Sequence, residues 1–183
     1  TVLLMDTGAP PHLPLTAEHH AAPLALEFSS GRHRFVVSTG SAAHLEADWR
    51  QAARETSAHS TVTLSDRSVA DFLGDDWLGR RLGLLMAALP WRVTVNRHEN
   101  QGVSAVVAGH DGYLGPLGLM HERTIRLSPR GERIDGRDRI FSPSRRRTVK
   151  AAAALRFHIH PDIKLIRLTS GAVQMIAGDG EAW

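Results

Sequence analysis

The sequence predicts an all-β fold, an antiparallel β-sandwich, on three observations. Short segments alternate apolar and polar residues with period two, and clusters of Gly, Pro, Ser and Asp separate them. A single stretch of the chain has helical spacing. The 183 residues are 42% hydrophobic, which is enough for one domain with a sizeable core. The number of candidate strands then favours a sandwich of packed sheets.

The expected strands follow one another along the whole chain. In the first, Leu24, Leu26 and Phe28 share one face, and in the next Phe35 and Val37 do. Further strands are expected at 59–66, 91–98, 103–109, 119–127, 155–160, 163–169 and 172–177.

The segments between these strands have different signatures. The Ala-rich stretch 42–56, with Leu45 and Trp49 at helical spacing, predicts a short surface helix. Residues 77–89 fit neither period and are expected to be a connection, and the glycines within 112–118 predict a loop.

Composition limits the domain count and the class of protein. We expect one domain over residues 1–183, cut from a longer chain, because the sequence starts at Thr1 and stops at Trp183 just after an apolar segment. No stretch approaches the ~20 apolar residues of a membrane span, so no membrane partner is expected. The absence of cysteine excludes disulfides and thiolate metal sites.

The formal charge of +3, which comes largely from arginine, favours an anionic partner. Both uronate polymers and nucleic acid fit that description. Only 5% of the residues are aromatic and there is one tyrosine, so no stacking residues are interleaved with the basic ones. This weakens the nucleic-acid interpretation, and most of the arginines are expected to be solvated surface groups.

An ordered set of motifs occupies the N-terminal third of the chain. It consists of His20, Ala25-Leu26-Glu27-Phe28, the turn Ser29-Ser30-Gly31, Phe35-Val36-Val37-Ser38-Thr39-Gly40 and Ala58-His59-Ser60-Thr61-Val62. In this order and spacing the set resembles the start of the C-terminal β-domain of the heparinase II/III family of polysaccharide lyases. The resemblance extends over roughly residues 3 to 177.

The resemblance implies a function for the longer protein. The sandwich would close one side of a cleft whose other wall is an N-terminal helical toroid, and the full-length protein would cleave a uronic-acid-containing acidic polysaccharide by β-elimination. This piece alone would be inactive. The alternative is a non-catalytic glycan-binding or structural β-domain descended from such lyases. The resemblance slightly favours the periplasm of a bacterium over its cytoplasm.

The resemblance also implies a metal site. In family members that hold zinc, the ligands are the first His, the Asp that ends the next strand and the His of the last motif, which correspond here to His20, Ser38 and His59. Ser38 replaces the Asp, and a neutral hydroxyl is a poorer zinc ligand than a carboxylate. Asp6 or Asp111 could complete the site. The alternative is that His20 and His59 form a hydrogen-bonded pair at a sheet edge.

Catalytic groups are scarce in this segment. Some family members carry a second His two residues before the first ligand, where this chain has Glu18. β-Elimination needs an acid for the leaving oxygen and a group that neutralises the carboxylate. In the family these groups lie in the toroid. Within this chain the candidates are Tyr113 and His110, with a loop anchor as the alternative role for Tyr113.

A second motif contains His158 and His160. Their i, i+2 spacing on a strand would send both imidazoles to one face, where they could converge on a metal or bind a sugar together with Arg156 and Arg123. The alternative is a half-buried edge strand in which the two histidines hydrogen-bond a neighbouring strand. His121 is expected to have a structural role.

Overall fold

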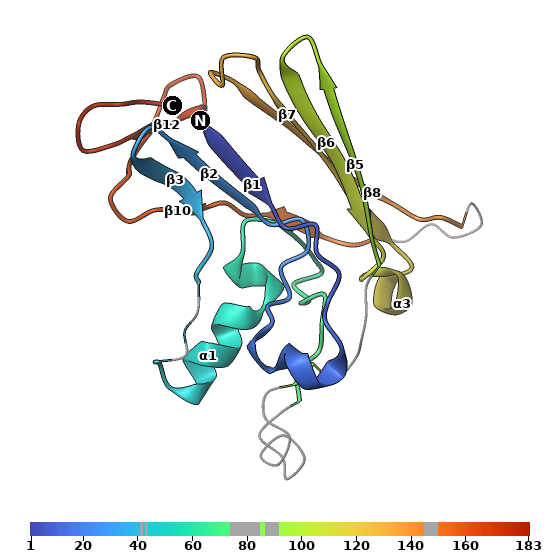
Figure 1. The fold of residues 1–183 in the computed structure, drawn as a ribbon. Coiled ribbons are helices and arrows are strands. Elements are labelled where there is room, and N and C mark those ends of the chain that lie inside the picture. The colour runs from blue at the N-terminus through green and yellow to red at the C-terminus, as the bar shows by residue number, and fades with distance from the viewer. Residues whose placement is uncertain (41, 43, 74–84, 87–91, 145–149) are drawn as a thin grey trace.

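The structure of the protein, a computed structural model, describes residues 1–40, 42, 44–73, 85–86, 92–144 and 150–183. The described chain contains two four-stranded antiparallel sheets and two two-stranded ones. Figure 1 shows the two larger sheets as separate layers, joined below by loops and short helices. The prediction of an all-β, antiparallel fold is confirmed.

The first large sheet has the order β1-β2-β3-β10 and carries the N-terminal motifs. Its strands are β1 Val2–Met5, β2 Leu26–Ser30, β3 His33–Val37 and β10 His158–Ile159. Leu24 lies outside it, since its φ of 57° places it in a turn before β2, so the expected strand face shared with Leu26 is wrong for this residue.

The second large sheet has the sequential order β5-β6-β7-β8. Its strands are β5 Val93–Asn100, β6 Val103–His110, β7 Met120–Leu127 and β8 Ile134–Phe141. Gln101 and Gly102, with φ values of 48° and 78°, join β5 to β6 through a two-residue turn of the mirror-image type that matches strand twist. Because these strands follow one another in sequence, each is paired with the next in an unbroken register, over eight residue pairs for β5–β6 and β7–β8 and seven for β6–β7.

The remaining elements are short and connect the two sheets. The two-stranded sheets pair β4 Val62–Leu64 with β9 Ala153–Leu155, and β11 Lys164–Arg167 with β12 Val173–Ile176. The helices are α1 Ala47–Arg54, α3 Leu114–Leu117 and the 3-10 turns Leu13–Glu18 and Thr56–Ala58. No helix among the described residues is long and apolar enough to cross a membrane.

Several expected boundaries differ from the structure. The strand expected at 155–160 is divided between β9 and β10, which belong to different sheets. The loop expected at 112–118 contains α3. The expected connection 77–89 lies outside the described residues except for positions 85 and 86.

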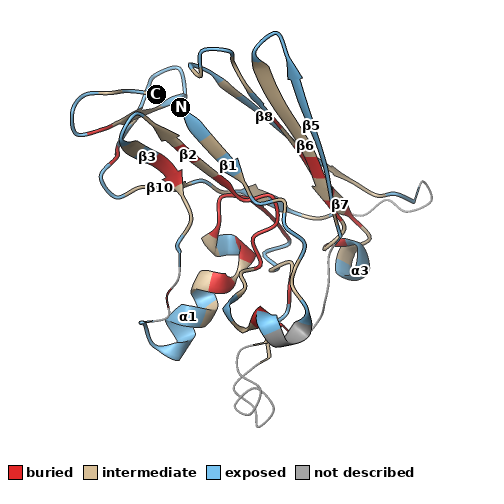
Figure 2. Cartoon of the chain, in the orientation of Figure 1, coloured by how far each residue is buried: buried red, intermediate tan, exposed pale blue. Residues whose placement is uncertain are grey.

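Buried residues gather in β2, β3 and the segments below them, whereas much of the second sheet is exposed or intermediate (Figure 2). Phe28 and Phe35 stack at 5.4 Å between ring centroids in the main cluster, and Trp183 packs edge-on against Phe28 at 4.6 Å. An apolar groove of about 830 Å³ remains between the two large sheets. Leu165 and Val173 line it and stay about half exposed, so the interior of the sandwich is only partly covered within the described chain.

Candidate functional site

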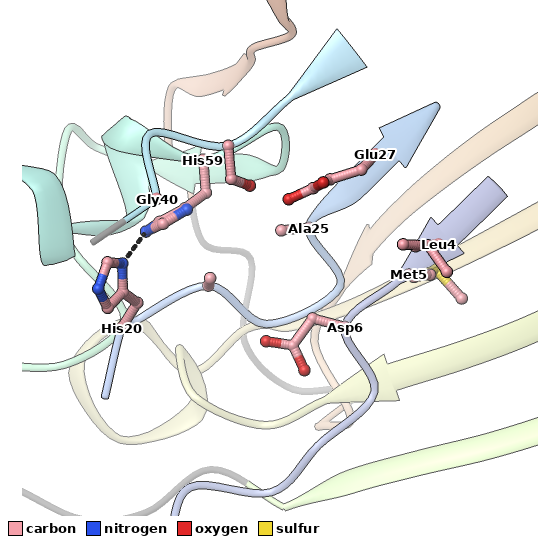
Figure 3. Close-up of a pocket in the computed structure, with 10 residues that line it drawn as sticks. Leu4, Met5, Asp6, His20, Ala25, Glu27, Gly40 and His59 are labelled. Atoms are coloured by element: carbon pink, nitrogen blue, oxygen red, sulfur yellow. Dashed lines mark hydrogen bonds between the residues drawn. The ribbon is translucent and has the colours of Figure 1, made fainter. Parts of the chain in front are cut away.

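A pocket of about 340 Å³ opens where β1, β2 and β3 meet the loops below them (Figure 3). The described residues that line it are Leu4, Met5, Asp6, His20, Ala22, Ala25, Glu27, Ser38, Gly40 and His59. The three positions suggested by the family resemblance, His20, Ser38 and His59, therefore lie in one pocket although they are distant in sequence.

His20 and His59 contact each other directly. Nδ1 of His20 lies 3.3 Å from Nε2 of His59, and the rings are tilted by 59° (Figure 3). Burial lowers the pKa of His20, with help from the positive charge of Arg54. Burial and then the neighbouring His20 lower the pKa of His59 to about 4. Both rings are therefore neutral at pH 7, and one can donate a hydrogen bond to the other.

The end of helix α1 holds the His20 segment in place. Ala21 donates its backbone N–H to the Arg54 carbonyl at 2.8 Å, and Nε of Arg54 donates to the His19 carbonyl at 3.0 Å. The hydroxyl of Thr56 donates to the Ala21 carbonyl at 2.7 Å. These bonds fix the backbone on both sides of His20, so the imidazole is presented from a rigid segment.

The charged side chains that line the pocket among the described residues are both acidic. Asp6 and Glu27 turn toward the pocket (Figure 3). One oxygen of Asp6 accepts the Gly8 N–H at 2.9 Å. Because the histidines are neutral, these carboxylates give the pocket a negative field, which favours a cation or a hydrogen-bond donor over an anionic sugar.

The histidine pair has half of the geometry of a zinc site. The 3.3 Å between the two nitrogens is close to the edge of a tetrahedron whose zinc–nitrogen bonds are about 2.0–2.1 Å. However, the described residues contain no group of three or more His, Cys, Asp or Glu side chains able to hold a metal. Nδ1 of His59 is buried and has no hydrogen-bond partner among the described residues, whereas a metal-binding histidine normally donates that N–H to an orienting group. The ligand atoms of the described residues do not complete a zinc site, and zinc binding stays a prediction.

A second histidine pair is buried in a directed chain of hydrogen bonds. The Gly112 N–H donates to Nδ1 of His110 at 3.2 Å, so the proton of neutral His110 is on Nε2, 3.1 Å from Nδ1 of His121. Nε2 of His121 then donates to Asp138 at 2.7 Å. Burial, His121 and Arg123 lower the pKa of His110 to about 3. The structural role expected for His121 agrees with this arrangement.

Arg123 completes this network. Its Nε and Nη2 donate to the two oxygens of Asp138 at 2.7 and 3.3 Å, and its Nη1 donates to the carbonyls of Leu24 and Ser60 at 2.7 and 2.9 Å. Burial alone would raise the pKa of Asp138, but the hydrogen bonds from His121 and Arg123 hold it below its usual value. Arg123 is 1% exposed, so the role expected for it in substrate binding is replaced by a structural one. It links strand β7 to the backbone at Leu24 and Ser60.

The catalytic candidates also face inward. Tyr113 is fully buried, and its hydroxyl donates to the Val62 carbonyl at 3.1 Å. Burial raises the pKa of Tyr113 to about 12. Tyr113 is therefore a loop anchor, as in the alternative that the sequence left open, and His110 belongs to the buried network. Neither lines the pocket of Figure 3.

His158 and His160 bond different neighbours. His158 donates from Nε2 to the Ser57 carbonyl at 3.0 Å, whereas His160 lies 3.2 Å from the Arg34 guanidinium. Arg156 bonds the Thr63 hydroxyl and lies 3.4 Å from Asp66. Strand β10 ends at residue 159, so strand alternation does not extend to His160. The four expected sugar-binding residues are thus distributed over separate contacts.

The family follows from a comparison of the whole chain with known proteins. The family model "Heparinase II/III-like, C-terminal" matches residues 1–183. This chain belongs to the heparinase II/III-like C-terminal family. It is also 30% identical to FtsZ-localized protein C of Caulobacter vibrioides, over 96% of this chain and 31% of that protein. The chain thus spans about a third of the length of that relative. No solved structure matches it.

Within this heparinase II/III-like domain, sequence reasoning missed Glu27 in the pocket and Asp138 in the network. The alternation of β2 could have found Glu27, because Leu26 and Phe28 are buried and the residue between them must point to the opposite face. Asp138 had no such signal. Its pairing with Arg123 depends on the register of β7 against β8, which the sequence of β8 alone does not reveal.

Proposed function

We propose that this chain is the β-domain of a longer heparinase II/III-like protein and that it binds acidic glycan without catalysing its cleavage. The observation that carries the non-catalytic part is the pocket at His20 and His59. Its third ligand position is Ser38, and the carboxylates of Asp6 and Glu27 oppose the approach of an anionic sugar. The basic charge of the chain supports an acidic ligand bound elsewhere on the domain.

A polysaccharide lyase is the second candidate function. The specific observation in its favour is the spacing of the two imidazole nitrogens, which suits a pair of metal ligands if another part of the longer protein supplies the rest. In that case the acid and the carboxylate-neutralising group would also come from outside this chain, because Tyr113 and Arg123 are buried.

Absorbance near 232 nm separates the two candidates. Full-length protein, with and without added zinc, is incubated with heparin, heparan sulfate, chondroitin and alginate, and growth of the unsaturated-uronate band is followed. We expect no band on any of these polymers. A band that His20→Ala or His59→Ala abolishes, with folding retained, would establish the lyase and overturn the non-catalytic proposal.

Restoring the missing carboxylate tests whether Ser38 is the reason. We expect Ser38→Asp to bind zinc at least about tenfold more tightly than the unmodified protein, about 1.4 kcal/mol, because an anionic carboxylate joins two neutral imidazoles as the third ligand. Titration calorimetry measures the change. Ser170→Asp, which adds the same charge in the exposed turn between β11 and β12, is the control and should leave zinc affinity unchanged. Equal affinities for Ser38→Asp and the unmodified protein would contradict this account of the pocket.

The name of the Caulobacter relative adds a partner to be tested. That protein is described as FtsZ-localized, and the match covers 96% of this chain. We propose that the longer protein containing this domain joins an assembly that includes FtsZ. Co-sedimentation of the full-length protein with FtsZ polymers tests this, and recovery in the supernatant at every FtsZ concentration would remove it.

A further inference from the structure

The β5–β8 sheet has an outer face that is chemically different from its inner face. In β7, His121, Arg123 and Ile125 point inward and are buried. The alternate residues, Thr124 and Arg126, therefore point outward. On β8 the register places Arg137 opposite Thr124, so Arg126 and Arg137 are diagonal neighbours on this outer face.

This outer face is hollowed across β5, β6 and β7. The hollow measures about 410 Å³. Its floor is made by three small or medium apolar side chains of β6, namely Val103, Ala105 and Val107. Hydrogen-bonding groups stand around it, among them Asn100 at the end of β5 and Thr124 and Arg126 on β7. The small floor leaves room for a flat ligand between polar rims.

Two arginines on this outer face, Arg126 in the lining of the hollow and Arg137 beside it on β8, carry charge that no described residue neutralises. Arg126 and Arg137 are exposed and make no hydrogen bond or ion pair with any described residue. The nearby acids are engaged elsewhere, since Asp135 pairs with Arg133 at 2.7 Å and Glu122 lies 3.8 Å from Arg139. One guanidinium group in the hollow and a second on the neighbouring strand β8 are thus available, each able to bind an oxyanion through two parallel hydrogen bonds.

We propose that this hollow is the binding site for an acidic oligosaccharide, an inference that rests on the glycan-binding function proposed above. Arg126 and Arg137 bind carboxylate or sulfate groups of the chain of sugars, and Asn100 and Thr124 bond its hydroxyls. The site lies on the face of the sheet turned away from Arg123. It is therefore separate from the pocket of His20 and His59.

Other polyanions fit the hollow less well. His98 is the one ring among the described residues that line it, and a single imidazole gives no series of platforms on which successive bases of single-stranded nucleic acid could stack. An extended acidic peptide would gain most of its affinity by pairing with a sheet edge. The hollow instead lies across the faces of three strands, where side chains and not backbone groups are presented.

Titration calorimetry with full-length protein tests the site, using heparin and alginate oligosaccharides as probes. Arg126→Gln combined with Arg137→Gln should weaken binding by at least about tenfold. Arg130→Gln combined with Arg32→Gln removes the same charge at exposed sites outside the hollow and should change affinity less than about threefold. Ala105→Gln fills the floor without changing charge and should also weaken binding, which keeps the test independent of net charge.

The outcomes separate this site from the broader function. If acidic oligosaccharide binds the Arg126/Arg137 variant and Ala105→Gln as tightly as it binds the unmodified protein, this site is overturned and glycan binding is left intact. No binding to the unmodified protein would overturn both proposals. Equal losses in the control variant would show non-specific attraction to net charge, and tighter binding of single-stranded DNA or polyglutamate than of any oligosaccharide would overturn the ligand class.

Discussion

Replacing Arg123 by methionine is expected to lower the free energy of unfolding by about 3–5 kcal/mol. The substitution keeps the aliphatic length of the side chain but removes every donor that Arg123 supplies to Asp138 and to the carbonyls of Leu24 and Ser60. Asp138 would then retain its bond from His121 alone while remaining largely buried. A charge left without its partner in a buried position costs far more than an exposed ion pair contributes.

Urea unfolding of the Arg123→Met variant measures this effect through the midpoint, with the slope showing whether the transition stays cooperative. Arg126→Met is the matched control, because it makes the same substitution three residues later on the exposed side of β7. It should shift the free energy of unfolding by no more than about 0.5 kcal/mol. A loss below about 1 kcal/mol for Arg123→Met would mean that the network does not hold the two layers together.

The buried arginine also shows where sequence reasoning stops. Arginine in a strand is normally a solvated surface residue, and nothing near Arg123 in the sequence marks it as an exception. Its burial depends on Asp138, which lies on the next strand and is brought opposite by the register of β7 and β8. Register follows from hairpin geometry and packing, so it could not be read from alternation alone.

The fold was more predictable than the site because alternation reports directly on burial. Strands β5, β6 and β7 lie close to their expected positions. Two strands were missed for identifiable reasons. The β1 segment Val2–Met5 is continuously apolar and has no alternation, and the β8 segment Ile134–Phe141 is so rich in Arg and Asp that its inward residues form no apolar pattern.

In the pocket, the family motifs succeeded where single-residue chemistry did not. The ordered motifs placed His20, Ser38 and His59 together because β2 and β3 form a hairpin and the 59–61 segment bonds back to the residues before β2. Tyr113 and His110 were chosen because their side chains could act in proton transfer, which carries no information about burial. In the structure both side chains are buried. His110 accepts the Gly112 N–H, and the Tyr113 hydroxyl donates to the Val62 carbonyl.

Acidification from pH 6.5 toward pH 4 is expected to destabilise the domain steeply. The pKa of His59 is lowered to about 4 and that of His110 to about 3 in the folded protein, from 6.5 when solvated. Below pH 6.5 the unfolded chain therefore binds protons that the folded chain does not. Each histidine adds up to about 1.4 kcal/mol of destabilisation per pH unit in this interval, and stability due to these groups is fully present above pH 6.5.

Urea midpoints between pH 4.5 and 8 measure this slope. His59→Gln should flatten it, since a neutral amide replaces one of the two titrating rings, whereas His44→Gln removes an exposed histidine and should leave the slope unchanged. A midpoint that stays constant from pH 6.5 to pH 5 would contradict the neutral, buried state of both rings. If the slope survives in His59→Gln but disappears when His110 is replaced, the acid sensitivity belongs to the network around Arg123, and the open pocket tolerates a charged His59.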